Sequence, residues 1–199
     1  MRDAILALRT VTFKPGTAKS GGCTAKTRRR SRMVLAHACL FALGMFATAE
    51  AAPVLVNGSL DGAVGPDTAA TGWTIANSTP DVVNESGPFN KTDTPWTLSP
   101  DGGTFVRGNG HHSDPGQFRE AFEQEVRGFS VGESYTLEFF QTNLGFLDFD
   151  DWLNRDGHWG LYVDGNLVGQ STTISGPPTS DTPITWVSDG ISFTATNTT

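Results

Sequence analysis

Cysteine is scarce in this chain of 199 residues, and both of its cysteines, Cys23 and Cys39, lie in the first fifth. Residues 52–199 contain none, which excludes a fold held together by disulfides. Helical periodicity is also missing from this part, because no stretch repeats its apolar residues every 3.6 positions. It has no apolar run long enough for a membrane span either. Residues 52–199 are therefore expected to form a non-helical domain with a core of its own.

Signatures of catalysis are lacking as well. The chain has no Gly-rich phosphate loop, no Ser-His-Asp nucleophile elbow and no cysteine nucleophile. Glycosidases use paired Asp and Glu residues, but nothing in the pattern marks one acid as the proton donor. The sequence predicts that the protein is not an enzyme, and a carbohydrate-active hydrolase is a distant alternative.

Charge is distributed unevenly along the chain. Residues 1–51 hold nine Lys or Arg and two acidic residues, a net charge of +7, whereas residues 52–199 hold five basic and 19 acidic residues, a net charge of −14. The acidic part would be repelled by nucleic acid and by anionic membranes. Neither is expected as a partner.

The first 51 residues have the order of an export leader. The basic cluster at residues 28–32 precedes the apolar run at residues 33–51, which ends in the A-x-A pattern Ala49-Glu50-Ala51. These are the three parts of a secretory signal peptide. Residues 1–51 are predicted to be a basic leader and signal, and no stable membrane span is expected after cleavage. An uncleaved single-pass anchor is the alternative.

Residues 52–199 have the length of a single domain. Apolar and polar residues alternate in several short runs, and a period of two is typical of strands with one buried face. The clearest alternations lie in residues 122–127, 135–139 and 159–163. The sequence Asp164-Gly165-Asn166 after the last of these is typical of a tight hairpin turn. The fold class predicted is all-β, a β-sandwich.

A series of motifs covers nearly all of residues 53–196. In order they are Val56-Asn57-Gly58-Ser59-Leu60-Asp61, Gly72-Trp73-Thr74, the segments at residues 99–106, 122–126 and 132–139, Trp186, and Phe193-Thr194-Ala195-Thr196. In this order the chain resembles the carbohydrate-binding-module-like, galactose-binding-like jelly rolls of exported bacterial proteins, the type often found with a C-terminal Pro-Glu-Pro (PEP-CTERM) sorting tail.

The resemblance implies a jelly-roll β-sandwich, one structural Ca²⁺ and an extracytoplasmic location. Asp61 and Asp101 match two of the calcium ligands, and an ordinary role of both residues in turns is the alternative. Similar domains continue with a further strand, a closing strand and the sorting tail. This chain stops at Thr199, so its domain is expected to lack its closing strand and the tail.

The segment at residues 148–159 has the most unusual local composition. Trp152 and Trp159 would stack on sugar rings, and Asp150, Asp151 and His158 would form hydrogen bonds with sugar hydroxyls. The alternative is a solvated loop whose tryptophans cover the edge of the sandwich.

The function predicted is non-catalytic binding of a polysaccharide or cell-surface glycan by a secreted or cell-surface protein. A structural or adhesive surface protein of the same fold, without a sugar site, is the alternative.

Overall fold

The computed structural model describes residues 4–16, 52–84, 99–110, 119–145, 156–178 and 182–199. Within these ranges the chain forms strands and no helix, and each paired set of strands is antiparallel. Nothing in the described part is a helix with the length and apolar character needed to cross a membrane. The all-β prediction is confirmed.

The described strands are β1 (Ala4–Pro15), β2 (Thr74–Asn77), β3 (Asp81–Val83), β4 (Phe105–Gly110), β5 (Ala121–Glu123), β6 (Ser134–Asn143), β7 (Gly160–Val163), β8 (Asn166–Gln170) and β9 (Val187–Thr194).

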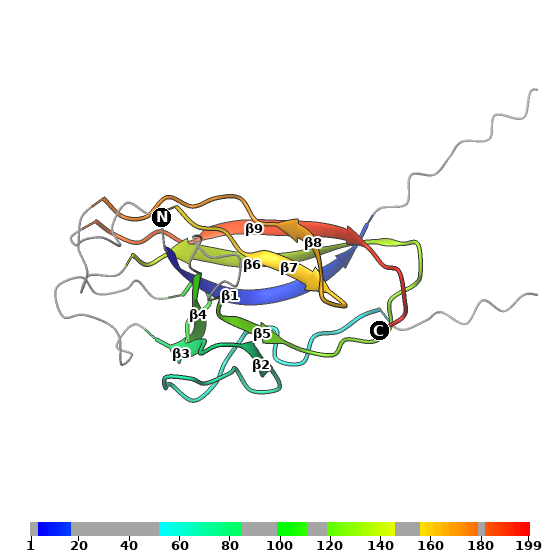
Figure 1. Cartoon of the computed structure of the whole chain (residues 1–199), viewed down its shortest axis with the longest axis horizontal. Helices are drawn as coiled ribbons and strands as arrows, with labels where there is room; N and C mark the ends of the chain where they lie inside the picture. The colour runs from blue at the N-terminus through cyan, green and yellow to red at the C-terminus, as the bar shows by residue number, and fades with distance from the viewer. Residues whose placement is uncertain (1–3, 17–51, 85–98, 111–118, 146–155, 179–181) are drawn as a thin grey trace, which may run out of the picture.

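Three sheets result from the pairing of these strands (Figure 1). The largest has five strands in the order β3-β4-β1-β6-β9, and β2–β5 and β7–β8 form two-stranded sheets. The sheets are fragmented and none is closed. The structure therefore supports an all-β fold of antiparallel sheets, and it does not show the predicted jelly roll.

Strand β1 differs from what the sequence predicts for the first 51 residues. They are assigned to a leader with no element of the fold, yet Ala4–Pro15 is the middle strand of the largest sheet. Residues 17–51, which include the predicted signal segment, lie outside the described residues. The domain boundary at residue 51 and cleavage there stay predictions.

The turn between β7 and β8 agrees with the sequence. Asp164 and Gly165 both have positive φ, 50° and 75°, as the favoured two-residue hairpin turn requires. Gly128 and Gly132, which bracket the connection from β5 to β6, also have positive φ, a conformation that costs glycine little. The residue types in these two connections thus fit the backbone conformations that the turns require.

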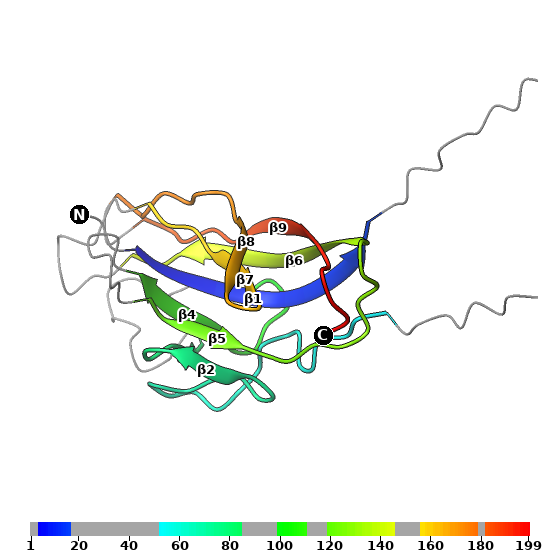
Figure 2. The same cartoon turned by 45° about the vertical axis from the view of Figure 1, so that its right-hand side comes forward.

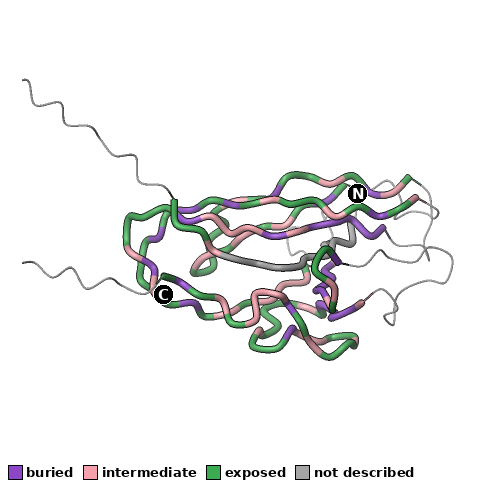
Figure 3. Tube along the Cα trace, turned by 180° about the vertical axis from the view of Figure 1, so that it is seen from behind, coloured by how far each residue is buried: buried purple, intermediate pink, exposed green. Residues whose placement is uncertain are grey.

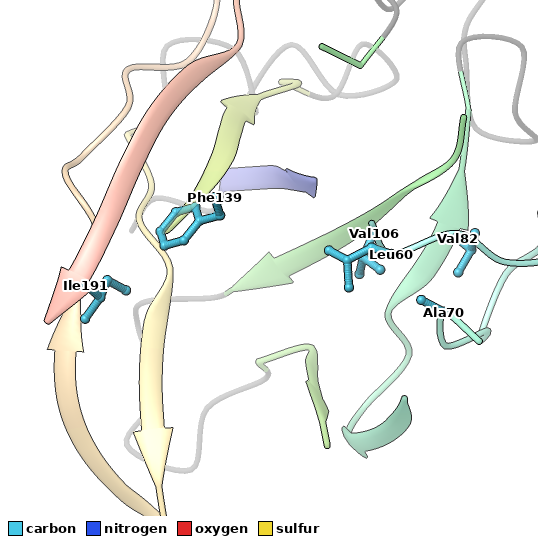
Figure 4. Packing of buried hydrophobic residues seen from close by; sticks show 6 residues of the cluster. All are labelled: Leu60, Ala70, Val82, Val106, Phe139 and Ile191. Atoms are coloured by element: carbon cyan, nitrogen blue, oxygen red, sulfur yellow. The ribbon is translucent and has the colours of Figure 1, made fainter. Parts of the chain in front are cut away.

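The main hydrophobic core lies on one face of the five-stranded sheet. Its buried members are Leu60, Ala70, Val82, Val106, Phe139 and Ile191 (Figure 4). Partly buried residues from the two small sheets, including Phe122 and Leu161, pack against it, so both pairs lie on the same face. Seen from behind, buried positions recur between more exposed ones along the strands (Figure 3). This is the alternation that a sheet with one covered face requires.

A second hydrophobic cluster is mainly aromatic. Its buried members are Val126, Phe129, Tyr135, Phe193 and Ala195. Phe129 contacts Tyr135 and Phe193 edge-on, with ring centroids 5.0 and 5.6 Å apart. Phe13 of β1 joins this group, and its ring centroid lies 5.2 Å from that of Phe129 and 6.0 Å from that of Phe193. Edge-to-face pairs contribute stability beyond the area they bury. Phe13 therefore attaches β1 to the body through its side chain as well as its backbone.

Replacing Phe13 by alanine tests whether β1 belongs to the folded protein. We expect Phe13→Ala in the full chain to lower the free energy of unfolding by about 2–3 kcal/mol, because a half-buried ring loses its apolar contacts. Urea denaturation measures the change. Val131→Ala, at a valine that is 62% exposed, is the control and should stay within about 0.5 kcal/mol of the parent. A Phe13→Ala chain as stable as that control would contradict the placement of β1.

Candidate functional site

The β7–β8 hairpin lies against the large sheet beside β9 (Figure 2). Leu161 and Val163 point inward and pack on the two hydrophobic clusters. Gly169, the cross-strand partner of Leu161, approaches Ile191 so closely that a Cβ atom there would lie 2.4 Å from the Ile191 Cγ2. The inner face of the hairpin is thus held tightly against the body, and its outer face is left to solvent.

The outer face of the hairpin carries one aromatic ring among polar groups. Tyr162 is 46% exposed and pairs across the hairpin with Leu167, while Gly160 pairs with Gln170. Because residues two apart in a strand share a face, Gly160 and Tyr162 lie on the same side. The Tyr162 ring leans toward Gly160, where an added Cβ atom would come within 3.2 Å of it. The glycine therefore leaves the space in which the ring lies.

Two polar contacts fix groups on this face. Arg119 donates a hydrogen bond from Nη1 to the Tyr162 hydroxyl at 2.5 Å, although the two residues are 43 positions apart. Beside them, the amide Nε2 of Gln170 lies 2.8 Å from Nε2 of His158. An amide nitrogen only donates, so this histidine nitrogen accepts. We refer to Arg119, His158, Tyr162 and Gln170 as the hairpin face. All four are exposed.

Trp159, a predicted sugar-stacking residue, lies on the opposite side of the chain from its neighbour His158. Its ring is centred 6.0 Å from that of Phe122, and a Cβ atom on Gly108 would lie 2.9 Å from the indole Cη2. The indole Nε1 is buried and has no hydrogen-bond partner among the described residues. Trp159 thus packs against the core, as the edge-covering alternative expects, and His158 alone joins the hairpin face. A stacking role for Trp159 stays a prediction.

The other residues predicted to bind sugar, Trp152, Asp150 and Asp151, lie outside the described residues. Sequence reasoning missed Tyr162 and Arg119. The alternation in residues 159–163 already assigned Tyr162 to the polar side of the strand, which was the available signal. Nothing local connects Arg119 to that tyrosine.

Of the two predicted calcium ligands, Asp61 follows a turn at residues 56–59 and Asp101 lies in a turn. The Asp61 carboxylate accepts a hydrogen bond from Ser59 Oγ at 2.8 Å, and Asp101 lies in a turn closed by the Gly102 amide bonding to the Ser99 carbonyl at 3.0 Å. No group of three metal-ligating side chains occurs in the described ranges. Calcium prefers six to eight oxygen ligands, so two carboxylates do not by themselves form a site. The Ca²⁺ stays a prediction.

A separate ionisable cluster lies between β3, β4 and the residue before β5. Asp81 and Arg107 are register partners and form a buried ion pair. Close by, the Glu120 carboxylate accepts hydrogen bonds from the Asn109 amide at 2.7 Å and the Thr79 hydroxyl at 3.2 Å. The pKa of Glu120 is raised to about 7, mainly because burial penalises the charged carboxylate. The charge of Asp81 also raises it, and the hydrogen bonds from Asn109 and Thr79 and the charge of Arg107 lower it.

The protonation of Glu120 makes the stability of the fold depend on pH. Between pH 4.5, its ordinary pKa, and about pH 7, the folded chain holds a proton that the unfolded chain has released. The free energy of unfolding therefore falls as pH rises through this window. The free energy of unfolding of Glu120→Gln should therefore change less with pH in this window. At pH 8 this variant should be more stable than the parent by roughly 1 kcal/mol, because solvent reaches the half-buried carboxylate and screens the effect.

Urea denaturation from pH 4.5 to 8 measures this effect. Glu133→Gln, at an exposed carboxylate in the turn before β6, is the matched control, and its profile should run parallel to that of the parent. If Glu120→Gln also ran parallel to the parent, Glu120 would not carry the pH dependence.

The chain was compared with family models, curated proteins and solved structures, and none of them matches it. The jelly-roll resemblance drawn from the order of its motifs therefore stays a prediction. The described structure supports an all-β fold of antiparallel sheets, and any function has to be argued from the geometry of its surface.

Proposed function

We propose that the protein is a non-catalytic, extracytoplasmic glycan-binding β-sandwich of the jelly-roll type, and that the hairpin face is its sugar site. One observation carries the proposal: an exposed tyrosine ring is held by Arg119 on a hairpin that packs against the core, with His158 and Gln170 on the same outer face. Sugar rings present an apolar face and a rim of hydroxyls. A site for them pairs an aromatic platform with a few fixed polar groups.

Each member of the hairpin face has a separate role in this proposal. The Tyr162 ring stacks on the apolar face of one sugar unit, because Gly160 leaves no side chain to displace it. The Arg119 guanidinium donates to the tyrosine hydroxyl and so holds the ring in position. His158 and Gln170 offer further donors and acceptors. The predicted residues Trp152, Asp150 and Asp151 would extend the site.

Substitution of Tyr162 tests the site. Tyr162→Ala should weaken binding on a glycan array about tenfold or more, because it removes the stacking ring, which is worth about 1.4 kcal/mol or more in this role. Tyr162→Phe keeps the ring and loses the bond to Arg119, so a smaller loss is expected. Affinity for the best array ligand is then measured by titration calorimetry.

Val64→Ala, another exposed apolar residue but one in the loop before β2, is the control and should bind like the parent. Parent-like affinity in Tyr162→Ala would rule out the hairpin face. Binding to cells or matrix without any soluble sugar ligand would favour the adhesive alternative instead.

The predicted calcium at Asp61 and Asp101 is tested separately. If it is present, a chelator should lower the midpoint of thermal unfolding and added Ca²⁺ should restore it, because a ligand of the folded state stabilises that state. A midpoint that does not change with chelator would count against the site.

A further inference from the structure

One polar side chain interrupts the apolar face of β6. Tyr135, Leu137 and Phe139 pack in the hydrophobic clusters on the covered side of the sheet. Gln141 continues the same alternation, because residues two apart in a strand share a face, and it is completely buried. A primary amide in such a place needs partners for its carbonyl and its N–H groups, since burial without them is costly. These partners come from β9 and from the segment after β8.

The amide nitrogen of Gln141 lies beside an acid and a hydroxyl. Its Nε2 donates to Asp189 Oδ2 at 2.6 Å, and Thr172 Oγ1 lies 3.3 Å from the same nitrogen. The Thr172 hydroxyl in turn donates to that same Asp189 oxygen at 2.7 Å. The register pairs Asp189 with Phe139, two residues before Gln141, so the two polar side chains are diagonal neighbours on one face. One carboxylate oxygen thus contacts both a hydroxyl and an amide nitrogen.

The carbonyl of the same amide has a separate donor. Ser171 is buried and donates from Oγ to Gln141 Oε1 at 2.9 Å. A donor in this position stabilises negative charge that develops on the oxygen. Thr172, the next residue, is exposed, so its hydroxyl meets the buried amide from the solvent side. Together these groups are the parts of an acyl transfer: a hydroxyl nucleophile, a base, a polarised carbonyl and access to solvent for a small leaving group.

We propose that the protein forms an internal ester crosslink between Thr172 and Gln141, with Asp189 as the base. Thr172 Oγ1 attacks Gln141 Cδ, and the hydroxyl proton passes to Asp189 Oδ2. Ser171 donates to the oxyanion of the tetrahedral intermediate. The Cδ–Nε2 bond then breaks, and Asp189 gives the proton to the departing nitrogen, which leaves as ammonia. The products are one Thr–Gln ester and one NH3, with no change of oxidation state and no co-reactant.

Position supplies the rate that this reaction lacks in solution. A free hydroxyl barely reacts with a primary amide in water, but groups fixed in one structure reach effective concentrations far above those of free reactants. The complete burial of Gln141 also keeps competing water from its carbonyl. Ammonia is protonated and diluted once it reaches solvent, so the reverse reaction is suppressed.

The crosslink ties the end of the β7–β8 hairpin to β6. Its two residues are 31 positions apart, and a covalent bond that closes a loop of this length stabilises a fold by restricting the unfolded chain. Residues 52–199 contain no cysteine, so no disulfide can fill this role within them. The proposal is independent of sugar binding, because none of the residues involved belongs to the hairpin face.

Peptide mass mapping of the folded, full-length chain tests the crosslink. Trypsin cuts after Lys and Arg, and residues 127–199 contain only Arg127 and Arg155, so residues 128–155 and 156–199 are released as two peptides. Gln141 lies in the first and Thr172 in the second. We expect one joined species, lighter than the sum of the two peptides by one ammonia. Mild alkali or hydroxylamine should separate it, because both cleave esters and spare amides. Two separate peptides of unchanged mass from the folded chain would overturn the proposal.

Variants distinguish the roles of the groups. Thr172→Val and Asp189→Asn keep the shape of the side chain but remove the nucleophile or the base, so neither should give the joined species. Thr172→Ser keeps a hydroxyl and should give it. Ser171→Ala should form it more slowly, by roughly a hundredfold, because the oxyanion loses one donor. Thr173→Val, at the exposed neighbour, is the matched control and should behave like the parent.

The valine variants keep the test decisive if a change inside the network prevents folding. Thr172 and Thr173 are both exposed, so both variants should fold, and circular dichroism checks that they do. Joined peptides that persist in Thr172→Val would assign the attack to another hydroxyl and contradict the proposal. Their loss in Thr173→Val would contradict it as well.

Discussion

The pairing of β1 with both β4 and β6 is the constraint on which the rest of the structure depends. Backbone N–H and C=O groups in the interior of a sheet need partners, and a missing middle strand would leave two facing edges without them. β6 alone has a partner on each side over most of its length, β1 on one and β9 on the other. The core on that face, from Val106 to Ile191, requires the five strands to stay in one sheet.

The leader predicted from the sequence includes this same segment. The leader prediction removes residues 1–51, whereas the sheet uses residues 4–15 as its middle strand. A chain cleaved at residue 51 would lose this strand, and β4 and β6 would each be left with an unpaired edge.

Strand β7 contributes one face to the hydrophobic core and the other face to the surface of the β7–β8 hairpin. Trp159, Leu161 and Val163 face the body, and the residues between them face solvent. Buried polar groups secure the segment after β8: Gln141 donates to Asp189 at 2.6 Å and accepts from Ser171 at 2.9 Å. Such a satisfied interior network favours one arrangement, because a half-made one leaves buried groups without partners. These bonds join the end of the hairpin to β6 and β9.

Sequence alone determined the all-β class, the alternation along β6 and β7, and the turn at Asp164 and Gly165, because these follow from local period and local φ preferences. The β-branched alternation at residues 10–13 was also readable as a strand, but the leader pattern beside it favoured another interpretation. Tertiary structure alone decided that this segment lies between β4 and β6 and that Arg119 meets Tyr162. Pairing partners are chosen by contacts between distant segments, and no local pattern encodes such contacts.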